Sequence, residues 1–159
     1  SPVMQAVTKY AKNGGKVLGI CNGFQVLTEA GLLPGALKRN ESLHFLSKHH
    51  NLKVVNNDNI FLEKLHNGDI VNIPIAHHDG NYYIDENGLK ELYENNQILL
   101  KYCDEEGNDK NPNGSVDSIA GVCNKEKNVF GLMPHPERAM EKLLGSNDGI
   151  KMLQGFLQA

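Results

Sequence analysis

The sequence predicts an α/β fold in which helices cover the faces of an open sheet, and residues 1–31 carry most of that prediction. Residues 3–11 place apolar side chains at helical spacing behind Ser1 and Pro2, which suit the cap and the first position of a helix. The apolar run 16–20 is typical of a buried parallel strand, and helical spacing resumes over 24–30 before Gly31. This order of helix, strand and helix is typical of such a sheet.

The rest of the chain adds strands and short helices. Val71, Ile73 and Ile75 alternate with other residues within 70–76, which predicts a half-buried strand. Further strands are expected at 43–46, 52–55 and 97–102, and a hairpin at 118–123 and 129–133. Helical patterns occur around 89–93, after Glu137 and from 148 to the end, while 104–115 is expected to be a polar loop.

Length and composition indicate one soluble domain. The chain has 159 residues, 40% of them hydrophobic, and a net charge of -3, which favours neither nucleic acid nor an anionic membrane as a partner. No apolar run approaches the roughly 20 residues that cross a bilayer, and the sequence begins without a signal-segment pattern. Its three cysteines have no C-x-x-C spacing, so reduced thiols and a cytoplasmic location are expected.

The segment Gly19-Ile20-Cys21-Asn22-Gly23 lies where the first strand meets the second helix. A nucleophile at a sharp strand-to-helix turn needs small residues on either side, and the two glycines occupy those positions. The helix N-terminus favours a thiolate over a thiol, and its N–H groups, beginning with that of Asn22, can receive an oxyanion. Cys21 is therefore a candidate nucleophile. The alternative is a small buried cysteine at an ordinary junction, where glycines are common.

The segment Pro134-His135-Pro136-Glu137-Arg138 directly follows the strand expected at 129–133. A cysteine nucleophile is commonly matched with a histidine base and a third group that orients the histidine. His135 and Glu137 could fill these two roles, because the flanking prolines restrict the backbone and an extended segment would let the carboxylate reach the ring. The alternative is a rigid surface loop in which Glu137 and Arg138 begin a helix.

Other polar residues give weaker signals. The adjacent histidine pairs at 49–50 and 77–78 point to opposite faces of a strand, so no metal site is predicted. His77 and Asp79 would share a side if the chain is extended and could border a substrate pocket or a partner surface; the alternative is turn chemistry at 79–81. Cys103 and Cys123 lack any elbow or nearby base and are expected to be structural.

Four segments, taken in order, resemble a known family. They are Gly19-Ile20-Cys21-Asn22-Gly23-Phe24-Gln25, Pro74-Ile75-Ala76-His77, Asn111-Pro112-Asn113-Gly114-Ser115 and Met133-Pro134-His135-Pro136-Glu137-Arg138. Together they are similar to the glutaminase subunits of phosphoribosylformylglycinamidine synthase, which are class I glutamine amidotransferases of purine biosynthesis. The resemblance covers the chain from residue 1 to its C-terminus.

The resemblance implies a flavodoxin-like amidotransferase fold, with an open, largely parallel sheet, helices on both faces and added antiparallel strands. Residues 1–159 would form one type 1 amidotransferase domain that hydrolyses glutamine through a thioester on Cys21, with His135 as base and acid and Glu137 orienting it. Asn22, Gly23 and Gln25 would contact the substrate or its oxyanion, while His77, Asp79 and Arg138 are candidates for pocket or partner contacts.

The resemblance also implies partners. Ammonia would pass to a synthetase subunit that holds ATP and magnesium, with a small accessory subunit in the complex, and no cofactor is expected in this chain. Family members typically place a strand, a helix, a second strand and a Gly-Gly loop before the segment that matches Ser1, so the domain is expected to be N-terminally truncated. That loop would supply a second oxyanion donor. Two rival hypotheses are another Cys-His hydrolase of this fold, such as a peptidase, and an inactive module that only binds the partner.

Overall fold

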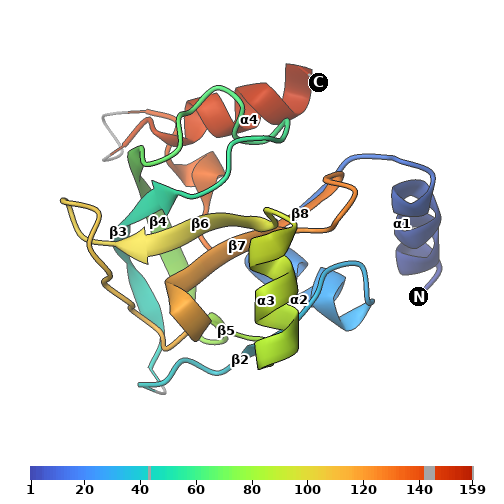
Figure 1. Ribbon diagram of the computed structural model, residues 1–159, viewed down its shortest axis with the longest axis horizontal. Coiled ribbons are helices and arrows are strands. Elements are labelled where there is room, and N and C mark those ends of the chain that lie inside the picture. The colour runs from blue at the N-terminus through green and yellow to red at the C-terminus, as the bar shows by residue number, and fades with distance from the viewer. Residues whose placement is uncertain (43, 142–145, 159) are drawn as a thin grey trace.

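A computed structural model describes residues 1–42, 44–141 and 146–158, and its strands form two sheets (Figure 1). The six-stranded sheet has the order β1-β8-β7-β6-β3-β4, and β2 pairs with β5. The strands are β1 (Val17–Ile20), β2 (Ala36–Lys38), β3 (Leu46–Val54), β4 (Ile70–His77), β5 (Asn81–Tyr83), β6 (Ile98–Cys103), β7 (Ile119–Cys123) and β8 (Val129–Leu132). The helices are α1 (Pro2–Lys12), α2 (Asn22–Glu29), α3 (Glu86–Glu94) and α4 (Gly149–Gln158), with 3₁₀ turns η1 (Val116–Ser118) and η2 (Pro136–Arg138).

Parallel pairing is confined, among the described strands, to β1 and β8, which corrects the expectation of a largely parallel sheet. The pairs β8·β7, β7·β6, β6·β3 and β3·β4 are all antiparallel. Antiparallel neighbours can be joined by short turns, as β7 and β8 are, whereas parallel strands need a long crossover. Residues 21–128 separate β1 from β8 and provide that crossover.

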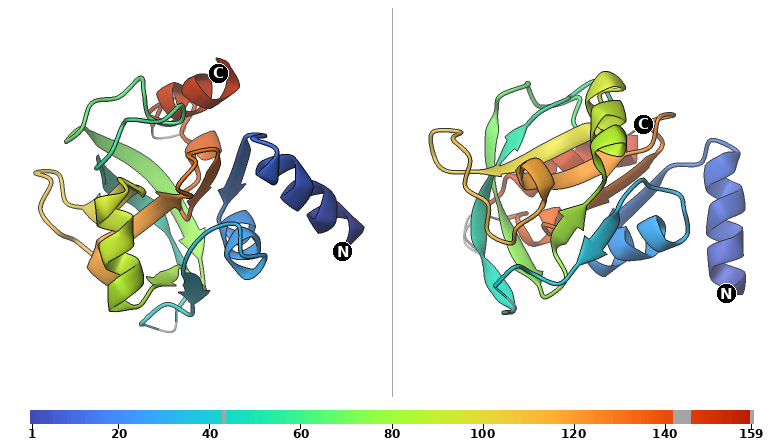
Figure 2. Two further views of the ribbon diagram at one scale, coloured as in Figure 1. Left: turned by 45° about the vertical axis from the view of Figure 1, so that its right-hand side comes forward. Right: turned by 60° about the horizontal axis from the view of Figure 1, so that its bottom comes forward.

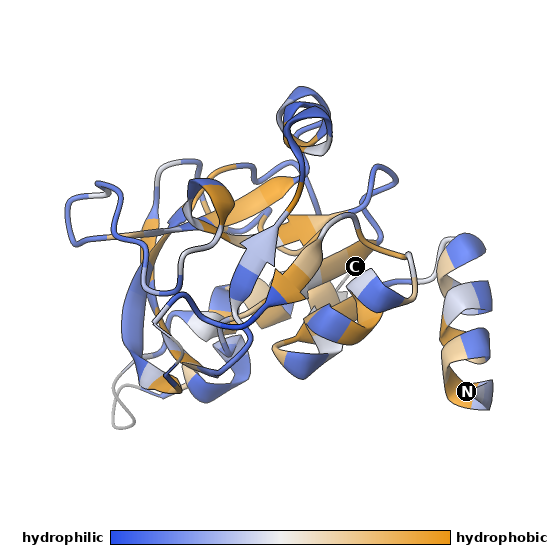
Figure 3. Ribbon diagram, turned by 90° about the horizontal axis from the view of Figure 1, so that it is seen from below, coloured by the Kyte–Doolittle hydropathy of each residue, from blue (hydrophilic) through white to orange (hydrophobic). Residues whose placement is uncertain are grey.

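Helices cover both faces of the sheet, as predicted, and each face has its own apolar core. On β8, Phe130 and Leu132 belong to the core that includes Met152 of α4. The other core contains Val129 together with Phe24 of α2 and Leu92 of α3. Alternate residues of a strand point to opposite faces, which explains the division along β8. Figure 3 shows the apolar residues gathered on the central strands and the polar ones on the surrounding loops.

Helix α1 lies at the side of the main body and projects from it (Figure 2). It begins as predicted, with the Ser1 hydroxyl accepting a hydrogen bond from the Met4 N–H at 3.2 Å. Ala11 is its buried residue, whereas Val3 and Tyr10 are exposed. The sequence therefore predicted the local structure of this helix, while its apolar stripe is only partly covered.

Most predicted elements are confirmed, including those at 16–20, 70–76 and 97–102 and the hairpin. The strand expected at 52–55 is the end of the longer β3, which begins at Leu46, and residue 43 of the other expected strand lies outside the described residues. The short strands β2 and β5 were not predicted, because three residues are too few to show alternation. The helical pattern expected after Glu137 is the turn η2 within residues 136–141, residues 142–145 lie outside the description, and the helix expected from 148 is α4.

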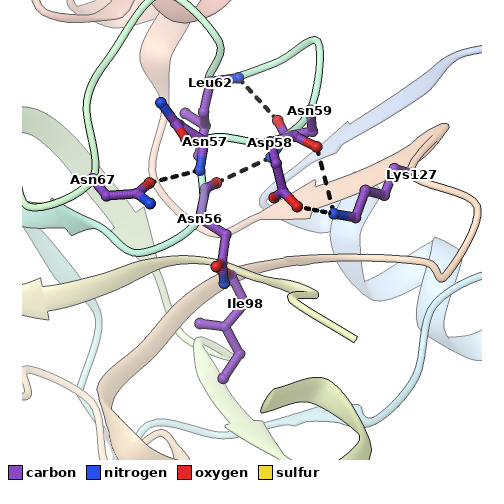
Figure 4. A network of polar contacts seen from close by, with 8 residues as sticks. All are labelled: Asn56, Asn57, Asp58, Asn59, Leu62, Asn67, Ile98 and Lys127. Atoms are coloured by element: carbon purple, nitrogen blue, oxygen red, sulfur yellow. Dashed lines mark hydrogen bonds and ion pairs between the residues drawn. The ribbon is translucent and has the colours of Figure 1, made fainter. Parts of the chain in front are cut away.

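An asparagine-rich loop after β3 is held by side-chain hydrogen bonds (Figure 4) as well as by the packing of Phe61 and Leu62 in the core. Asn56 donates to the Ile98 carbonyl of β6 at 2.7 Å, and Asn59 accepts from the Leu62 N–H at 2.9 Å. Lys127, on the turn between β7 and β8, donates to the Asp58 carboxylate at 2.5 Å. Side-chain amides can replace backbone partners in irregular segments, so this loop is ordered without regular structure.

Candidate active site

Cys21 occupies a strained turn between β1 and α2. Its backbone has φ 56° and ψ -108°, a conformation that costs a non-glycine residue about 1–3 kcal/mol. A Cβ at Gly19 would lie 2.5 Å from Leu27 Cδ1 and 2.7 Å from the backbone carbon and oxygen of Gly23. The predicted crowding is therefore present at Gly19, and the elbow geometry is as expected.

Gly23 differs from that expectation. A Cβ built at Gly23 meets no atom within 4 Å, and its φ lies outside the left-handed region. The close contact at the elbow is thus between Gly19 and the backbone of Gly23. This contact does not exclude a side chain at Gly23 itself. The open space beside Gly23 lies in the first turn of α2, close to Cys21 along the chain.

The Cys21 thiol is half-buried and donates to the Ala76 carbonyl at 3.4 Å. Burial raises the pKa of Cys21, although the Asn22 N–H and the Arg138 charge act in the opposite direction. The helix N-terminus therefore favours the thiolate as predicted, but loss of solvation outweighs it. A thiol with a raised pKa is protonated at neutral pH, so a nucleophilic role for Cys21 would require a base.

His135 and Glu137 make the contact that the sequence allowed. The His135 Nδ1 lies 2.9 Å from Glu137 Oε2, and the His135 ring is buried while Glu137 is half-exposed. A carboxylate can only accept, so Nδ1 carries the proton and Nε2 is left as the basic nitrogen. Arg138 Nε lies 3.9 Å from the same Glu137 oxygen, which adds a positive charge beside the carboxylate.

The sheet brings Cys21, His135 and strand β4 together at the carboxyl ends of β1 and β8. In the parallel pair β1·β8, Ile20 is the register partner of Leu132, so Cys21 and the segment that leads to His135 leave adjacent carboxyl ends. Strand β4 lies at the other end of the strand order, yet its Pro74 carbonyl accepts from the His135 N–H at 2.8 Å. The Ala76 carbonyl of the same strand contacts Cys21, so the curled sheet places β4 against both residues.

The remaining predicted residues have different surroundings. Asn22 is exposed and Gln25 is half-buried, with its amide donating to Glu29 Oε1 at 3.3 Å; both lie in the first turns of α2 beside Cys21. His77 is buried, with a pKa lowered to about 4 by burial, whereas Asp79 is half-exposed and lies 3.9 Å from Arg39. The chain bends at residues 78 and 79, so the extended course on which a shared side for His77 and Asp79 depended is absent.

Three buried polar residues near these strand ends were not among the predicted site residues, although the loop 111–115, which contains Asn113, was a candidate for positioning or partner contact. Asn113 donates to the Tyr102 hydroxyl at 3.2 Å and approaches His77 Nε2 at 3.4 Å. Asn40 is fully buried and donates to the His77 carbonyl at 2.8 Å. Asn113 falls in the turn motif 111–115, which was a signal for its loop, but no local pattern marked Tyr102 or Asn40.

Two kinds of feature are absent from the described residues. Residues 1–42, 44–141 and 146–158 contain no group of three His, Cys, Asp or Glu side chains placed to hold a metal ion. No helix within these ranges is long and apolar enough to cross a membrane. Cys103 and Cys123 are buried in the core, where burial raises the pKa of each thiol.

The strained Cys21 turn and the His135–Glu137 contact lie at the adjacent carboxyl ends of two strands of an α/β sheet. Residues 1–151 match the family of CobB/CobQ-like glutamine amidotransferase domains, and the chain belongs to this family. The match confirms the prediction that this chain is a glutamine amidotransferase enzyme.

Individual relatives are more specific. Over its whole length the chain is 86% identical to the phosphoribosylformylglycinamidine synthase subunit PurQ of Sulfurimonas denitrificans, and it spans 71% of that protein. It is 68% identical to the subunit of the same name from Wolinella succinogenes, over 98% of this chain and 69% of the relative. These relatives confirm the resemblance to the glutaminase subunits of that synthase.

Solved structures confirm the fold. A chain in the structure of PurLQS from Thermotoga maritima has a TM-score of 0.85 and 43% identity, over 98% of this chain and 67% of that one. A glutamine amidotransferase from Thermotoga maritima has a TM-score of 0.55 at 16% identity, over 98% and 60% of the two chains, and this likeness shows the fold alone. The predicted amidotransferase fold class is therefore confirmed, with a mixed sheet in place of the largely parallel one.

Proposed function

We propose that this chain is the glutaminase subunit of a phosphoribosylformylglycinamidine synthase of purine biosynthesis, with Cys21 as its nucleophile, His135 as its base and Glu137 as the group that orients His135. The observation that carries the proposal is the 2.9 Å contact between His135 Nδ1 and Glu137 Oε2 at the carboxyl end of β8, beside the strained Cys21 at the end of β1. The subunits named PurQ that resemble the chain support the choice of pathway.

The first half of the reaction forms a thioester. His135 Nε2 accepts the proton of the Cys21 thiol, and the sulfur attacks the γ-carbonyl carbon of glutamine. The new C–S bond places negative charge on the carbonyl oxygen, which the N–H groups at the start of α2 can stabilise, beginning with that of Asn22. The C–N bond then breaks as His135 returns the proton to nitrogen, and ammonia leaves.

The second half releases glutamate. His135 takes a proton from water, the hydroxide oxygen attacks the thioester carbon, and the C–S bond breaks as the proton returns to sulfur. Glu137 stabilises the protonated ring in both halves and keeps Nδ1 protonated, so that Nε2 is always the nitrogen that faces the reaction. Arg138 lowers the pKa of Cys21 by its charge, which helps formation of the thiolate.

Ammonia then serves a second active site. We propose that it passes to a synthetase subunit, with the small accessory subunit completing the complex; the PurLQS structure, which contains a similar chain, supports such an assembly. Exclusion of water by that assembly would keep ammonia neutral and prevent its loss. Asn22, Gly23 and Gln25 would contact the glutamine. The thiol chemistry suits the reducing cytoplasm, where we place the complex.

The proposal is tested by measuring glutamate released from glutamine, by the chain alone and with a synthetase subunit. We expect Cys21→Ser and His135→Ala each to lower kcat by about 10²–10⁴-fold, the usual range for loss of acid–base or nucleophilic function. Glu137→Gln should lower kcat as well, whereas Glu126→Gln, at an exposed glutamate on the β7–β8 turn, should not.

Mass spectrometry with a glutamine-analogue electrophile distinguishes the rival hypotheses. The proposal predicts one adduct on Cys21, lost in His135→Ala, with the buried Cys103 and Cys123 as internal controls. Peptide cleavage without glutamine hydrolysis would indicate another Cys-His hydrolase. Synthetase binding with neither hydrolysis nor an adduct would indicate an inactive binding module.

A further inference from the structure

Three buried side-chain atoms lack a hydrogen-bond partner within residues 1–42, 44–141 and 146–158, and all three lie around Asn113 and Tyr102. They are His50 Nε2, His77 Nδ1 and Ser115 Oγ. The His50 ring packs against the Tyr102 ring with centroids 5.4 Å apart. A buried polar group without a partner costs about 1–3 kcal/mol, so a cluster of them is not explained by stability.

Asn113 organises this cluster and determines the state of His77. Its Oδ1 accepts from the Ser115 N–H at 3.2 Å, so its amide group faces Tyr102 and His77. The amide can only donate, and therefore both the Tyr102 hydroxyl and His77 Nε2 accept, at 3.2 Å and 3.4 Å. His77 is thus an uncharged ring protonated on Nδ1, and burial keeps it uncharged because it lowers its pKa to about 4.

The backbone around His77 is also held by hydrogen bonds, which are made by Asn40. The Asn40 amide donates to the carbonyls of His77 and His44, each at 2.8 Å, and the Asn40 oxygen accepts from the Gly80 N–H at 2.9 Å. Asn40 also donates its own N–H to the His78 carbonyl at 2.7 Å. The end of β4 is therefore held by the buried Asn40 side chain and by the Asn40 backbone.

The same strand end contacts both proposed reacting residues. The Ala76 carbonyl accepts from the Cys21 thiol, and the Pro74 carbonyl accepts from the His135 N–H. We propose that His77, held by Asn113, which in turn is hydrogen-bonded to Tyr102, is a positioning residue that sets the end of β4 and thereby the relative placement of Cys21 and His135. The inference rests on the proposed function, and it adds residues that do not touch the reacting atoms.

Gly80 offers a direct test, because it packs against the His77 ring. A Cβ at Gly80 would lie 2.3 Å from His77 Cε1 and 2.4 Å from Nδ1, and its three nearest atoms all belong to that ring. The φ of Gly80 lies outside the left-handed region, so alanine fits its backbone. Gly80→Ala should therefore displace the His77 ring without deleting a hydrogen-bonding group. Gly88→Ala, at a position in α3, is the matched control, since its Cβ would lie 2.5 Å from Ile84 Cγ1.

The experiment measures kcat and KM for glutamine hydrolysis by the wild-type complex and each variant, with the Tm of each. A misplacement near 1 Å can cost about 10²-fold, so we expect Gly80→Ala to lower kcat by roughly 10–100-fold with little change in KM. Gly88→Ala should keep the wild-type kcat even if its Tm falls. His77→Gln, which retains an acceptor for Asn113, should keep most of the activity that His77→Ala loses.

A double variant completes the test. With the ring removed by His77→Ala, Gly80→Ala has no clash to make and should cause no further loss of kcat. A wild-type kcat in Gly80→Ala, or an undiminished effect of Gly80→Ala in the His77→Ala background, would overturn the positioning role while leaving the proposed function intact. A wild-type complex that fails to hydrolyse glutamine would instead overturn the proposed function.

Discussion

The two glycines that flank Cys21 should respond in opposite ways to the same substitution. A Cβ at Gly19 would approach Leu27 Cδ1 to 2.5 Å and two backbone atoms of Gly23 to 2.7 Å, about 1 Å inside ordinary carbon contacts. The leucine methyl can turn away, but the backbone atoms belong to the first turn of α2 and cannot. Overpacking of this kind costs about 1–3 kcal/mol, and we expect Gly19→Ala to lie near the upper limit, about 3 kcal/mol.

The matched variant is Gly23→Ala. Its Cβ would enter open space, and alanine is favoured over glycine in a helix by up to about 1 kcal/mol. We therefore expect Gly23→Ala to be neutral or stabilising, although it adds a methyl group beside the proposed substrate site and should raise KM for glutamine.

Urea unfolding followed by circular dichroism measures the free energy of unfolding of both variants. With about 2–4 °C of Tm per kcal/mol for a domain of this size, Gly19→Ala should lower Tm by roughly 6–12 °C and Gly23→Ala should not. Equal losses in the two variants would refute the assignment of the crowding to Gly19 alone. A stable Gly19→Ala variant would show that the elbow is not tightly packed.

Three further outcomes are expected. Cys21→Gly should be more stable than Cys21→Ala by about 1 kcal/mol, measured by urea unfolding, because glycine relieves the strain at φ 56° while losing more backbone entropy; equal stabilities would count against strain. The alkylation rate of Cys21 should have its pH midpoint above that of an exposed cysteine because burial raises the pKa, with a higher midpoint in Arg138→Gln and a lower one in Glu137→Gln; reversed shifts would contradict the charge assignment. Lys127→Met should reduce stability by less than about 1 kcal/mol near neutral pH, because the pair with Asp58 is largely at the surface. Lys127 lowers the pKa of Asp58 in the folded chain, so this difference is present above about pH 4 and should vanish as pH falls through the folded pKa; a pH-independent difference would exclude the ion pair.

The sequence predicted the elements whose signals are local. The helix behind Ser1, the buried strand before Cys21 and the alternation of Val71, Ile73 and Ile75 depend on neighbours within a few residues, and all three are present. The direction of the strands was not predictable in this way. Parallel and antiparallel strands both show short apolar runs, so only the pairing partners reveal that β1·β8 is the parallel pair of the described sheet.

In the candidate site, too, some residues were marked by local sequence and others were not. The glycines around Cys21 and the prolines around His135 marked both residues, because each local backbone demands a particular residue type. His77 was also marked as a candidate pocket or partner contact, but its contact with Asn113 comes from a distant loop, and the bend after β4 was not predicted. Nothing local could reveal that bend or the fully buried Asn40 that holds it.

By itself the sequence predicted the proposed nucleophile, base and orienting carboxylate, because each lies in a short segment with a stereochemical signature. Only the tertiary structure decided how these groups are charged and aligned. Burial raises the pKa of Cys21 against the pull of the helix N-terminus, and the curl of the sheet brings the end of β4 to both Cys21 and His135. Solvation and the approach of distant strands depend on how the whole chain packs, which no short segment encodes.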